Sequence, residues 1–311
     1  MSAREHRSRT MRSRAVLSAD HEARLARARL SLEGLSLGDA FGERFFVHPA
    51  AVDALIAERA LPAKAEWTWT DDTAMAISVV EELAAHGEID RDALAARFAR
   101  AYELDPRRGY GPGAHRILSA IQEGYLWDVA SRSVFGGEGS MGNGSAMRSA
   151  PIGAYFSDDL ACAAGMAALS ADPTHAHPDG RAGAAAVAVA AGLAASTTLT
   201  GVEFLDAVLA LTPAGATRDK LVEARDLTSL HARDAAAILG SGQSVLCSDT
   251  VPFSLWCASR HLDRYEEALW ATVSGLGDRD TTCAIVGGIV ALRVGAEGLP
   301  KDWLARREPL I

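Results

Sequence analysis

Apolar residues recur at helical spacing through almost the whole chain after Leu17. Runs in which β-branched and polar residues alternate, the pattern typical of strands, are nearly absent. Ser or Asp often precedes an apolar run and Gly or Pro follows it, as expected at helix ends. The pattern predicts helices over residues 18–38, 70–83, 90–104, 114–124, 160–170, 180–196, 201–211, 217–230, 251–261, 265–274 and 278–292. Because no connecting stretch resembles a domain linker, we expect one all-α domain over residues 18–311.

Two short acidic clusters open two of these helices. They are Thr70-Asp71-Asp72-Thr73 and Asp278-Arg279-Asp280-Thr281. Their carboxylates and hydroxyls are hard oxygen ligands, which suit Mg²⁺, Mn²⁺ or Ca²⁺ better than zinc. If the fold brings the two clusters together, they can form a two-metal hydrolytic site. The alternative is plain helix capping, since Thr and Asp cap helices and acids favour the positive end of the helix dipole.

A glycine-rich segment, residues 136–148, stands out against the helical background. So many glycines expose backbone N–H groups, and such groups can cradle a pyrophosphate. The segment is neither a Walker A loop nor a dinucleotide-binding fingerprint. A side chain at Gly142 or Gly144 would block the ligand's approach or strain a turn with positive φ.

Three further loops carry polar side chains. The segment 34–43 contains two acids among glycines and reads most simply as the end of a helix followed by a turn. His175 and His177 precede an Ala-rich helix, but with only Asp172 and Asp179 nearby a zinc site is disfavoured. The basic loop 107–113 is either a connector or a surface that stacks on a base or ribose.

Composition narrows the classes of function. With 311 residues and 49% hydrophobic content, the chain can bury a large core. A net charge of −9 disfavours a general nucleic-acid-binding surface. Four widely spaced cysteines indicate buried, reduced thiols in a cytoplasmic protein, and no apolar run reaches the length of a membrane span. Residues 1–17 are rich in Arg and Ser, and we expect them to form a disordered tail.

A series of short motifs runs in order from about residue 30 to residue 292. They are Leu37-Gly38-Asp39-Ala40, Thr70-Asp71-Asp72-Thr73, Gly142-Asn143-Gly144 with Ala146-Met147-Arg148, Thr174-His175, Thr250-Val251-Pro252 and Gly277-Asp278-Arg279-Asp280-Thr281. Together they resemble the motifs of the ADP-ribosyl-acceptor hydrolases, or ADP-ribosylglycohydrolases. Asp105-Pro106, Arg108-Gly109-Tyr110-Gly111 and Gly139-Ser140 look most like the type-3 branch, which removes ADP-ribose from serine, degrades poly-ADP-ribose and cleaves O-acetyl-ADP-ribose.

This resemblance implies a compact, orthogonal helical bundle with two Mg²⁺ ions in a central cleft, for which Mn²⁺ can substitute. The implied metal ligands are Thr70, Asp71 and Asp72 in one set and Asp278, Asp280 and Thr281 in the other. The residues expected to contact ADP-ribose are Tyr110, Gly139, Ser140, Met141, Gly142, Asn143, Gly144 and His175. We expect a monomer that hydrolyses ADP-ribose from a protein or small-molecule acceptor, and an ADP-ribosylated nucleobase stays among the open acceptors.

The chain departs from the family pattern in three places. The family usually carries a Glu seven residues after the first-motif Asp, and here that residue is Phe46. Glu43 is the nearest acid, so Glu43 or a metal-bound carboxylate, Asp72 or Asp280, is expected to manage the proton. Tyr110 stands where the arginine-directed branches carry an acid, and Leu276 interrupts the usual Gly-Gly-Asp, which we interpret as a mild change in a turn.

Two other functions fit the same residues. A two-metal phosphoesterase would attack phosphorus in a nucleotide-sugar instead of the anomeric carbon. An inactive family member, like the lens crystallins that share the fold, would bind ADP-ribose without turnover.

Overall fold

The computed structural model describes residues 18–63 and 66–310, so the predicted tail, residues 1–17, lies outside the described residues. The described part contains sixteen α-helices and three single-turn 3₁₀ helices. The α-helices are α1 (His21–Glu43), α2 (Pro49–Ala57), α3 (Asp71–His86), α4 (Arg91–Leu104), α5 (Pro112–Gln122), α6 (Trp127–Arg132), α7 (Ala150–Tyr155), α8 (Leu160–Ala171), α9 (Pro178–Ser196), α10 (Gly201–Leu211), α11 (Ala216–Asp226), α12 (Ala232–Leu239), α13 (Cys247–His261), α14 (Tyr265–Val273), α15 (Arg279–Val294) and α16 (Lys301–Leu304). The 3₁₀ turns are η1 (Phe135–Gly137), η2 (Asn143–Ser145) and η3 (Ala296–Gly298). These residues form no strand, only two isolated bridges, so the predicted all-α class is confirmed.

Helices α1 and α15 pack against each other more extensively than any other pair. Three glycines of α1, spaced by four residues, make this approach: Gly34, Gly38 and Gly42. A Cβ atom on Gly38 would overlap the carbonyl oxygen of Cys283 in α15. The expectation that the first helix ends near Gly38 and gives way to a turn is therefore wrong. The helix runs on to Glu43, because glycines at this spacing form a contact stripe.

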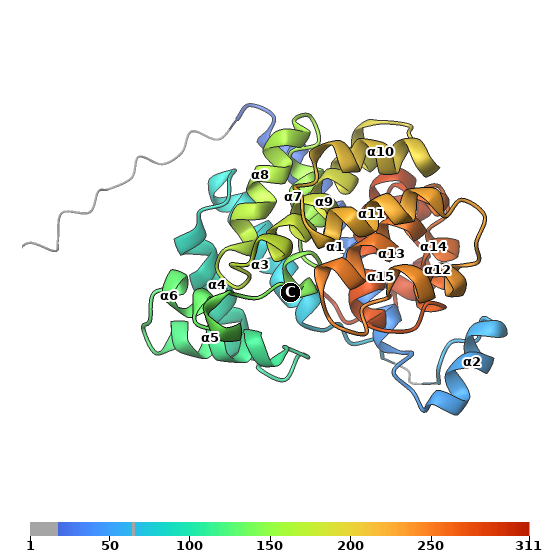
Figure 1. The fold of residues 1–311 in the computed structure, drawn as a ribbon, viewed down its shortest axis with the longest axis horizontal. Coiled ribbons are helices and arrows are strands. Elements are labelled where there is room, and N and C mark those ends of the chain that lie inside the picture. The colour runs from blue at the N-terminus through green and yellow to red at the C-terminus, as the bar shows by residue number, and fades with distance from the viewer. Residues whose placement is uncertain (1–17, 64–65, 311) are drawn as a thin grey trace, which may run out of the picture.

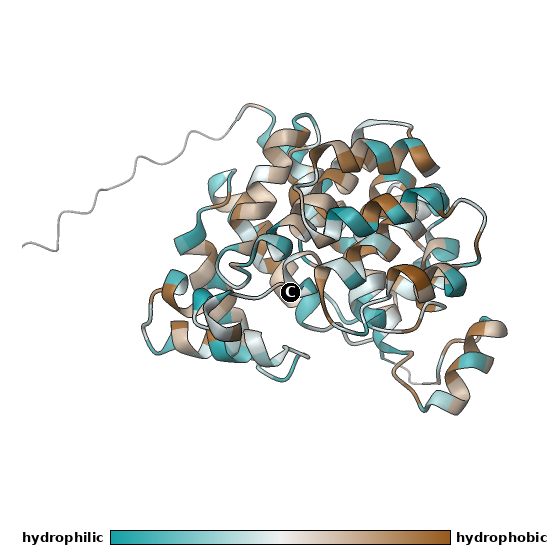
Figure 2. Ribbon diagram, in the orientation of Figure 1, coloured by the Kyte–Doolittle hydropathy of each residue, from teal (hydrophilic) through white to brown (hydrophobic). Residues whose placement is uncertain are grey.

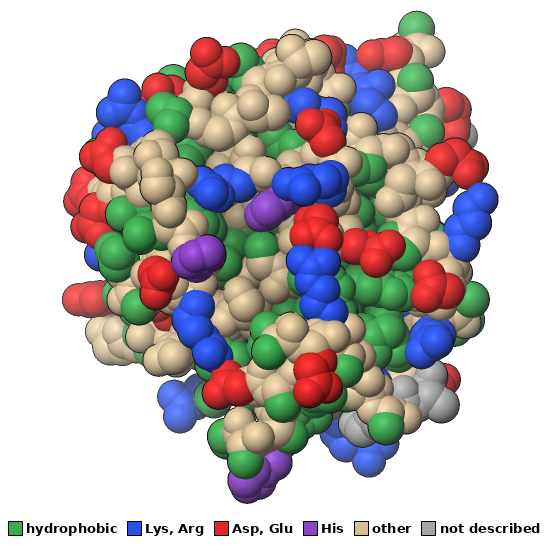
Figure 3. Space-filling view, turned by 90° about the vertical axis from the view of Figure 1, so that its right-hand side faces the viewer, with side chains coloured by type: hydrophobic (Ala, Val, Ile, Leu, Met, Phe, Trp, Pro, Cys, Tyr) green, Lys and Arg blue, Asp and Glu red, His purple; other side chains and the backbone are tan. Residues whose placement is uncertain are grey.

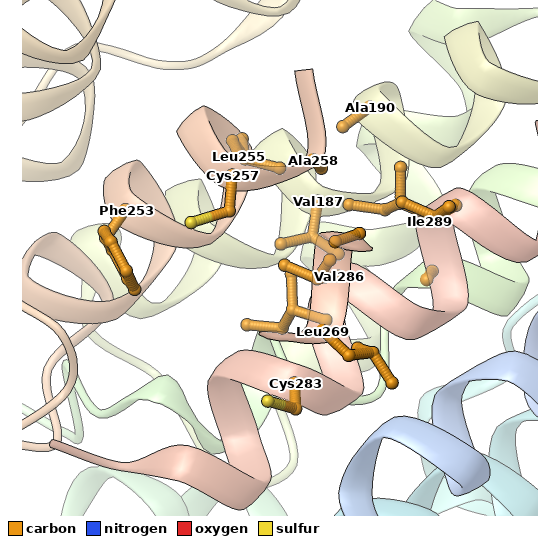
Figure 4. Close-up of a cluster of buried hydrophobic side chains, with 14 of the residues drawn as sticks. Val187, Ala190, Phe253, Leu255, Cys257, Ala258, Leu269, Cys283, Val286 and Ile289 are labelled. Carbon is orange, nitrogen blue, oxygen red and sulfur yellow. The ribbon is translucent and has the colours of Figure 1, made fainter. Parts of the chain in front are cut away.

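Two large groups of buried apolar side chains hold the helices together. One joins parts of α9, α10, α13, α14 and α15, and the other joins parts of α1, α3, α4, α7 and α8. Figure 4 shows part of the first group, with Val187 on α9 beside Val286 and Ile289 on α15. Most helices carry hydrophobic and hydrophilic residues side by side along the ribbon, as amphipathic packing requires (Figure 2).

The helix starts that carry the acidic clusters lie in the middle of the molecule. Helix α2 lies at one edge of the view and α5 with α6 at the opposite lower edge (Figure 1). Between them lie the start of α3, the segment 135–148 and the start of α15, which all line one cavity. On the face shown in Figure 3, positive and negative side chains are interspersed.

The helix boundaries follow local signals. Asp90 begins α4 by accepting bonds from Asp92 N and Ala93 N, and Gly87, with φ of 70°, closes α3. Among the described residues, no helix is both long and apolar enough to cross a membrane. All four cysteines are free thiols; three are buried, and Cys162 is half-buried.

Candidate active site

A cavity of about 430 Å³ lies where six parts of the chain meet. Its walls come from the start of α3, the loop 109–114, the glycine-rich segment 140–148, the pair Thr174 and His175, the loop 244–246 and the start of α15. This volume falls within the usual range for small-molecule sites. The two acidic clusters, about two hundred residues apart in sequence, thus lie on one cavity.

The first acidic cluster is held by Asp39 of α1. The Asp39 carboxylate accepts bonds from Thr70 N at 2.9 Å, Thr70 Oγ1 at 2.9 Å, Thr73 N at 3.2 Å and Thr73 Oγ1 at 2.5 Å. Thr70 is also the N-cap of α3, since its hydroxyl accepts from Asp72 N at 3.4 Å. Capping and site formation are therefore not alternatives here. The capping residue, fixed by Asp39, places Asp71 and Asp72 at the cavity wall.

The second cluster is arranged differently. Asp278 occupies the N-cap position of α15, yet its carboxylate makes no capping bond. Instead it accepts a bond of 2.7 Å from Asn143 Nδ2, which also donates to Thr250 Oγ1 at 3.0 Å. Across the cavity, the Thr281 hydroxyl lies 3.5 Å from Asp72 Oδ2. The predicted proximity of the two clusters is thus present in the fold.

The buried carboxylates of the two clusters repel one another. Burial first, and then the carboxylates of Asp39 and Asp278, raise the pKa of Asp71 to about 8. Burial and then Asp280 hold the pKa of Asp72 well above its usual range, while burial and then Asp278 do the same for Asp280. Burial also raises the pKa of Asp39 to about 6, against the four hydrogen bonds from Thr70 and Thr73. The positive charge of Arg148, which also lines the cavity, lowers the pKa of Asp71 but does not offset this repulsion.

The donor set fits a hard divalent cation. Asp72 Oδ1 and Asp280 Oδ1 are buried and accept no hydrogen bond from the described residues. Within residues 18–63 and 66–310, however, no three His, Cys, Asp or Glu side chains already converge as a finished metal cage. Mg²⁺ does not require such a cage, because it usually keeps several waters and takes one or two carboxylates. The orphaned oxygens and the raised carboxylate pKa values are what a cation would relieve.

The glycine-rich segment approaches the cavity with its backbone. Ser140 Oγ accepts a bond of 3.1 Å from Gly142 N, which fixes the turn before η2. Of the two reasons expected for these glycines, the strained turn does not apply, since Gly142 has a φ of −65° and Gly144 has no positive φ. Gly142 and Gly144 instead leave space, because Cβ atoms there would lie 3.4 Å and 3.2 Å from His175 Nε2. Gly139 is the position with a φ of 80°, and it packs against Ala176 outside the cavity wall.

The two histidines have different roles. His175 is buried on the cavity wall, and burial followed by the charge of Arg148 lowers its pKa well below the usual value. His177 begins α9 by accepting a bond of 3.1 Å from Asp179 N, so it acts as a cap.

Four predicted site residues do not line the cavity. Thr70 and Gly139 act behind it, as described above. Tyr110 is buried and packs edge-on against Tyr102 with 5.1 Å between ring centroids, so it is not placed to stack on an open base. Glu43 is the last residue of α1 and is half-buried. Phe46, at the usual Glu position, is 48% exposed and lies under the Arg279 guanidinium, 4.8 Å from its ring centroid.

Some site residues escaped the sequence interpretation. Asp39 was visible only as part of a motif, with no role assigned. The cavity-lining loop 244–246 carried no chemical signal, and it contributes Val245 O, which accepts a bond of 3.0 Å from Asn143 N. Leu276 has a φ of 60°, so replacing the family's glycine there is more than the mild change expected from sequence.

Known proteins of one family are similar to this chain. The family model for ADP-ribosylglycohydrolase matches residues 20–309. The chain is similar to ADP-ribosylhydrolase ARH3 of Mus musculus, at 28% identity over 90% of this chain and 86% of the relative. It is 31% identical to ADP-ribosylhydrolase ARH3 of Gallus gallus, over 76% of this chain and 72% of the relative.

A solved structure supports the fold. The chain in the ADP-ribosylglycohydrolase-related protein complex superposes with a TM-score of 0.59 at 23% identity, covering 92% of this chain and 94% of that one. At this identity the likeness concerns the fold alone. The matched family model and the ARH3 relatives, together with the meeting of the motifs on one cavity, mean that this chain belongs to the ADP-ribosylglycohydrolase family, as a glycohydrolase of its ARH3-like branch that acts in ADP-ribosyl hydrolysis.

Proposed function

We propose that this enzyme releases ADP-ribose from an ADP-ribosylated acceptor with the help of two Mg²⁺ ions, for which Mn²⁺ can substitute. One observation carries the proposal. Two acidic clusters with unpartnered carboxylate oxygens face the same cavity as a glycine-rich backbone. The carboxylates suit cations, and the exposed backbone beside them suits a diphosphate.

The residues that would hold metal are Asp71 and Asp72 on one side and Asp278, Asp280 and Thr281 on the other, with Thr70 contributing from behind the cavity wall, where it also caps α3. When bound, such ions polarise and orient ribose hydroxyls and help place a water near the anomeric carbon. Asp39 keeps Thr70 in place through the bonds described above, and Asn143 orients Asp278. Ser140, Met141, Gly142 and Gly144 line the cavity beside these groups and are the proposed diphosphate contacts.

We assign the role of general acid or base in the hydrolysis to a carboxylate that lines the cavity. Asp72 and Asp280 both line it, whereas Glu43 does not. A general acid or base must lie within hydrogen-bond reach of the proton that it moves. We therefore favour Asp72 or Asp280 for this role and keep Glu43 as the candidate to be tested against them.

The proposed acceptors are protein serine, O-acetyl-ADP-ribose and related O-linked ADP-ribose, as the similarity to the ARH3 branch suggests. A panel of defined ADP-ribosylated substrates, assayed with Mg²⁺ and with EDTA, tests this. Free ADP-ribose as product supports the proposal, and AMP with ribose 5-phosphate would indicate a phosphoesterase. Tight ADP-ribose binding without any product would indicate an inactive family member.

Metal dependence is tested on the same substrates. We expect EDTA to abolish turnover and Asp71→Ala, Asp72→Ala, Asp278→Ala or Asp280→Ala each to remove most of it while the protein stays folded. Asp302→Ala, at an exposed acid of α16, is the matched control and should keep full activity. Full activity in any two of the four cluster variants, or in metal-free enzyme, would overturn the two-metal proposal.

A further inference from the structure

Arg148 is a fully buried cation beside the cavity. Its guanidinium donates to Gly144 O at 2.9 Å, Ser170 O at 2.8 Å and Thr174 Oγ1 at 2.8 Å. It also lies over the ring of Phe98, 4.3 Å from the ring centroid. None of these partners is a carboxylate, and burial lowers its pKa to about 9. Burying a charge among neutral acceptors costs free energy, so we expect Arg148 to have a role beyond packing.

Thr174 links Arg148 to His175 through hydrogen bonds. Its hydroxyl is buried, accepts the bond from Arg148 and lies 2.7 Å from His175 Nδ1. A hydroxyl has one proton to donate, and within the described residues Nδ1 is the only acceptor that it contacts. If Nδ1 carried a proton, the hydroxyl proton would be buried without an acceptor, at the cost of a lost hydrogen bond. Arg148 therefore orients the hydroxyl, and the hydroxyl leaves Nδ1 as the acceptor.

The opposite nitrogen of the ring faces the glycine-rich segment. His175 Nε2 lies 3.4 Å and 3.2 Å from the positions that Cβ atoms on Gly142 and Gly144 would occupy. With Nδ1 accepting, the proton of the neutral ring must sit on Nε2. A phosphate oxygen at neutral pH is mainly an acceptor, so only this tautomer can donate to it. A ring protonated on Nδ1 would instead place the lone pair of Nε2 against a lone pair of the phosphate oxygen.

We propose that Arg148 and Thr174 are positioning residues that hold His175 as a neutral imidazole with its proton on Nε2, directed at a phosphate oxygen of the ligand. The ligand assignment rests on the proposed function, whereas the tautomer does not. Arg148 and Thr174 act through His175, because the hydrogen bonds that define their role end on its ring.

The tautomer is measured directly by long-range ¹⁵N–¹H correlation spectroscopy on the full chain labelled at histidine. His175→Ala identifies its signals among those of the nine histidines. In the free wild-type protein we expect a neutral ring protonated on Nε2. Thr174→Val, which removes the hydroxyl at similar volume, should lose that single pattern, and Thr174→Ser should restore it. A wild-type ring that is protonated on Nδ1 or charged, or an unchanged pattern in Thr174→Val, would overturn the proposal.

Ligand binding provides the second measurement. Calorimetry with ADP-ribose should show a roughly tenfold loss in Thr174→Val and near-normal affinity in Thr174→Ser, the scale of one hydrogen bond to a charged group. Adenosine, which has no phosphate, should bind all three proteins alike. An equal loss for both ligands would overturn the phosphate assignment. Because the spectrum is read without ligand, failure to bind ADP-ribose at all would overturn the proposed function and leave the tautomer to be judged on its own.

Discussion

Gly38 of α1 lies against Cys283 of α15 so closely that a Cβ atom on the glycine would overlap the cysteine's carbonyl oxygen. This contact has a consequence for the site. Asp39, the next residue, holds Thr70 and Thr73 at the first acidic cluster, while Asp280 lies three residues before Cys283 at the second. The approach of two backbones thus sets how far apart the two clusters lie.

A methyl group at Gly38 should therefore be costly. We expect Gly38→Ala to lower the free energy of unfolding by about 2 kcal/mol or more, because the neighbour is backbone and cannot rotate away. Gly165→Ala is the matched control, since a Cβ atom there meets nothing within 4 Å inside α8. It should be neutral or gain about 0.5 kcal/mol from the better helix former. Chemical denaturation measures both, and equal effects would contradict the close-packing argument.

The same glycines mark the limit of what the sequence reveals. The acidic clusters and their helices were predictable, because capping residues and apolar spacing are local signals. Gly34, Gly38 and Gly42 carry the same local signal as a helix end, and only the contact with α15 makes them part of one helix. The loop 244–246 acts through Val245 O, a backbone atom, which no side-chain pattern could indicate. Short helices such as α6 and α7 were missed because six residues carry too little periodicity.

Metal binding should be coupled to pH. The pKa of Asp71 is raised from 3.8 to about 8, so the folded protein keeps a proton that the unfolded chain releases. Its contribution to stability is fully present below about pH 4 and is lost as the pH rises towards about 8. A bound cation would replace that proton. We therefore expect Mg²⁺ to raise the melting temperature more at about pH 8 than at about pH 5.5.

The control for this prediction is the neutral variant Asp71→Asn. In EDTA its melting temperature should fall less over the same pH interval than that of the wild type, because one titrating carboxyl is gone. The measurement is differential scanning fluorimetry with and without Mg²⁺. A Mg²⁺ effect that is equal at both pH values would contradict the coupling.

Substitution by valine at two glycines of the glycine-rich segment 136–148 should have opposite effects on ligand binding and on stability. Gly142→Val should weaken ADP-ribose binding at least tenfold with little change in melting temperature, because its side chain would fill space at the cavity wall. Gly139→Val should mainly lower the melting temperature, since its φ is 80° and a Cβ atom would lie 2.8 Å from that of Ala176. Calorimetry and thermal unfolding of both variants check this. If Gly142→Val lowered ADP-ribose affinity and melting temperature together, the role of Gly142 would be structural.

The residue at the end of α1 tests where the proton is handled. If Glu43 were the acid–base group, as the sequence allows, Glu43→Gln would slow hydrolysis by roughly a hundredfold, the usual scale for losing such a group. Glu43 does not line the cavity, whereas Asp72 and Asp280 do and each keeps a buried oxygen that accepts no hydrogen bond from the described residues. We therefore now expect Glu43→Gln to retain turnover to within about threefold, with ADP-ribose binding and metal content unchanged, since a group outside the cavity cannot reach the reacting atoms. Steady-state kinetics on the ADP-ribosylated substrate decide the question. A hundredfold loss with normal binding would mean that the last turn of α1 rearranges in the substrate complex and brings Glu43 to the anomeric carbon.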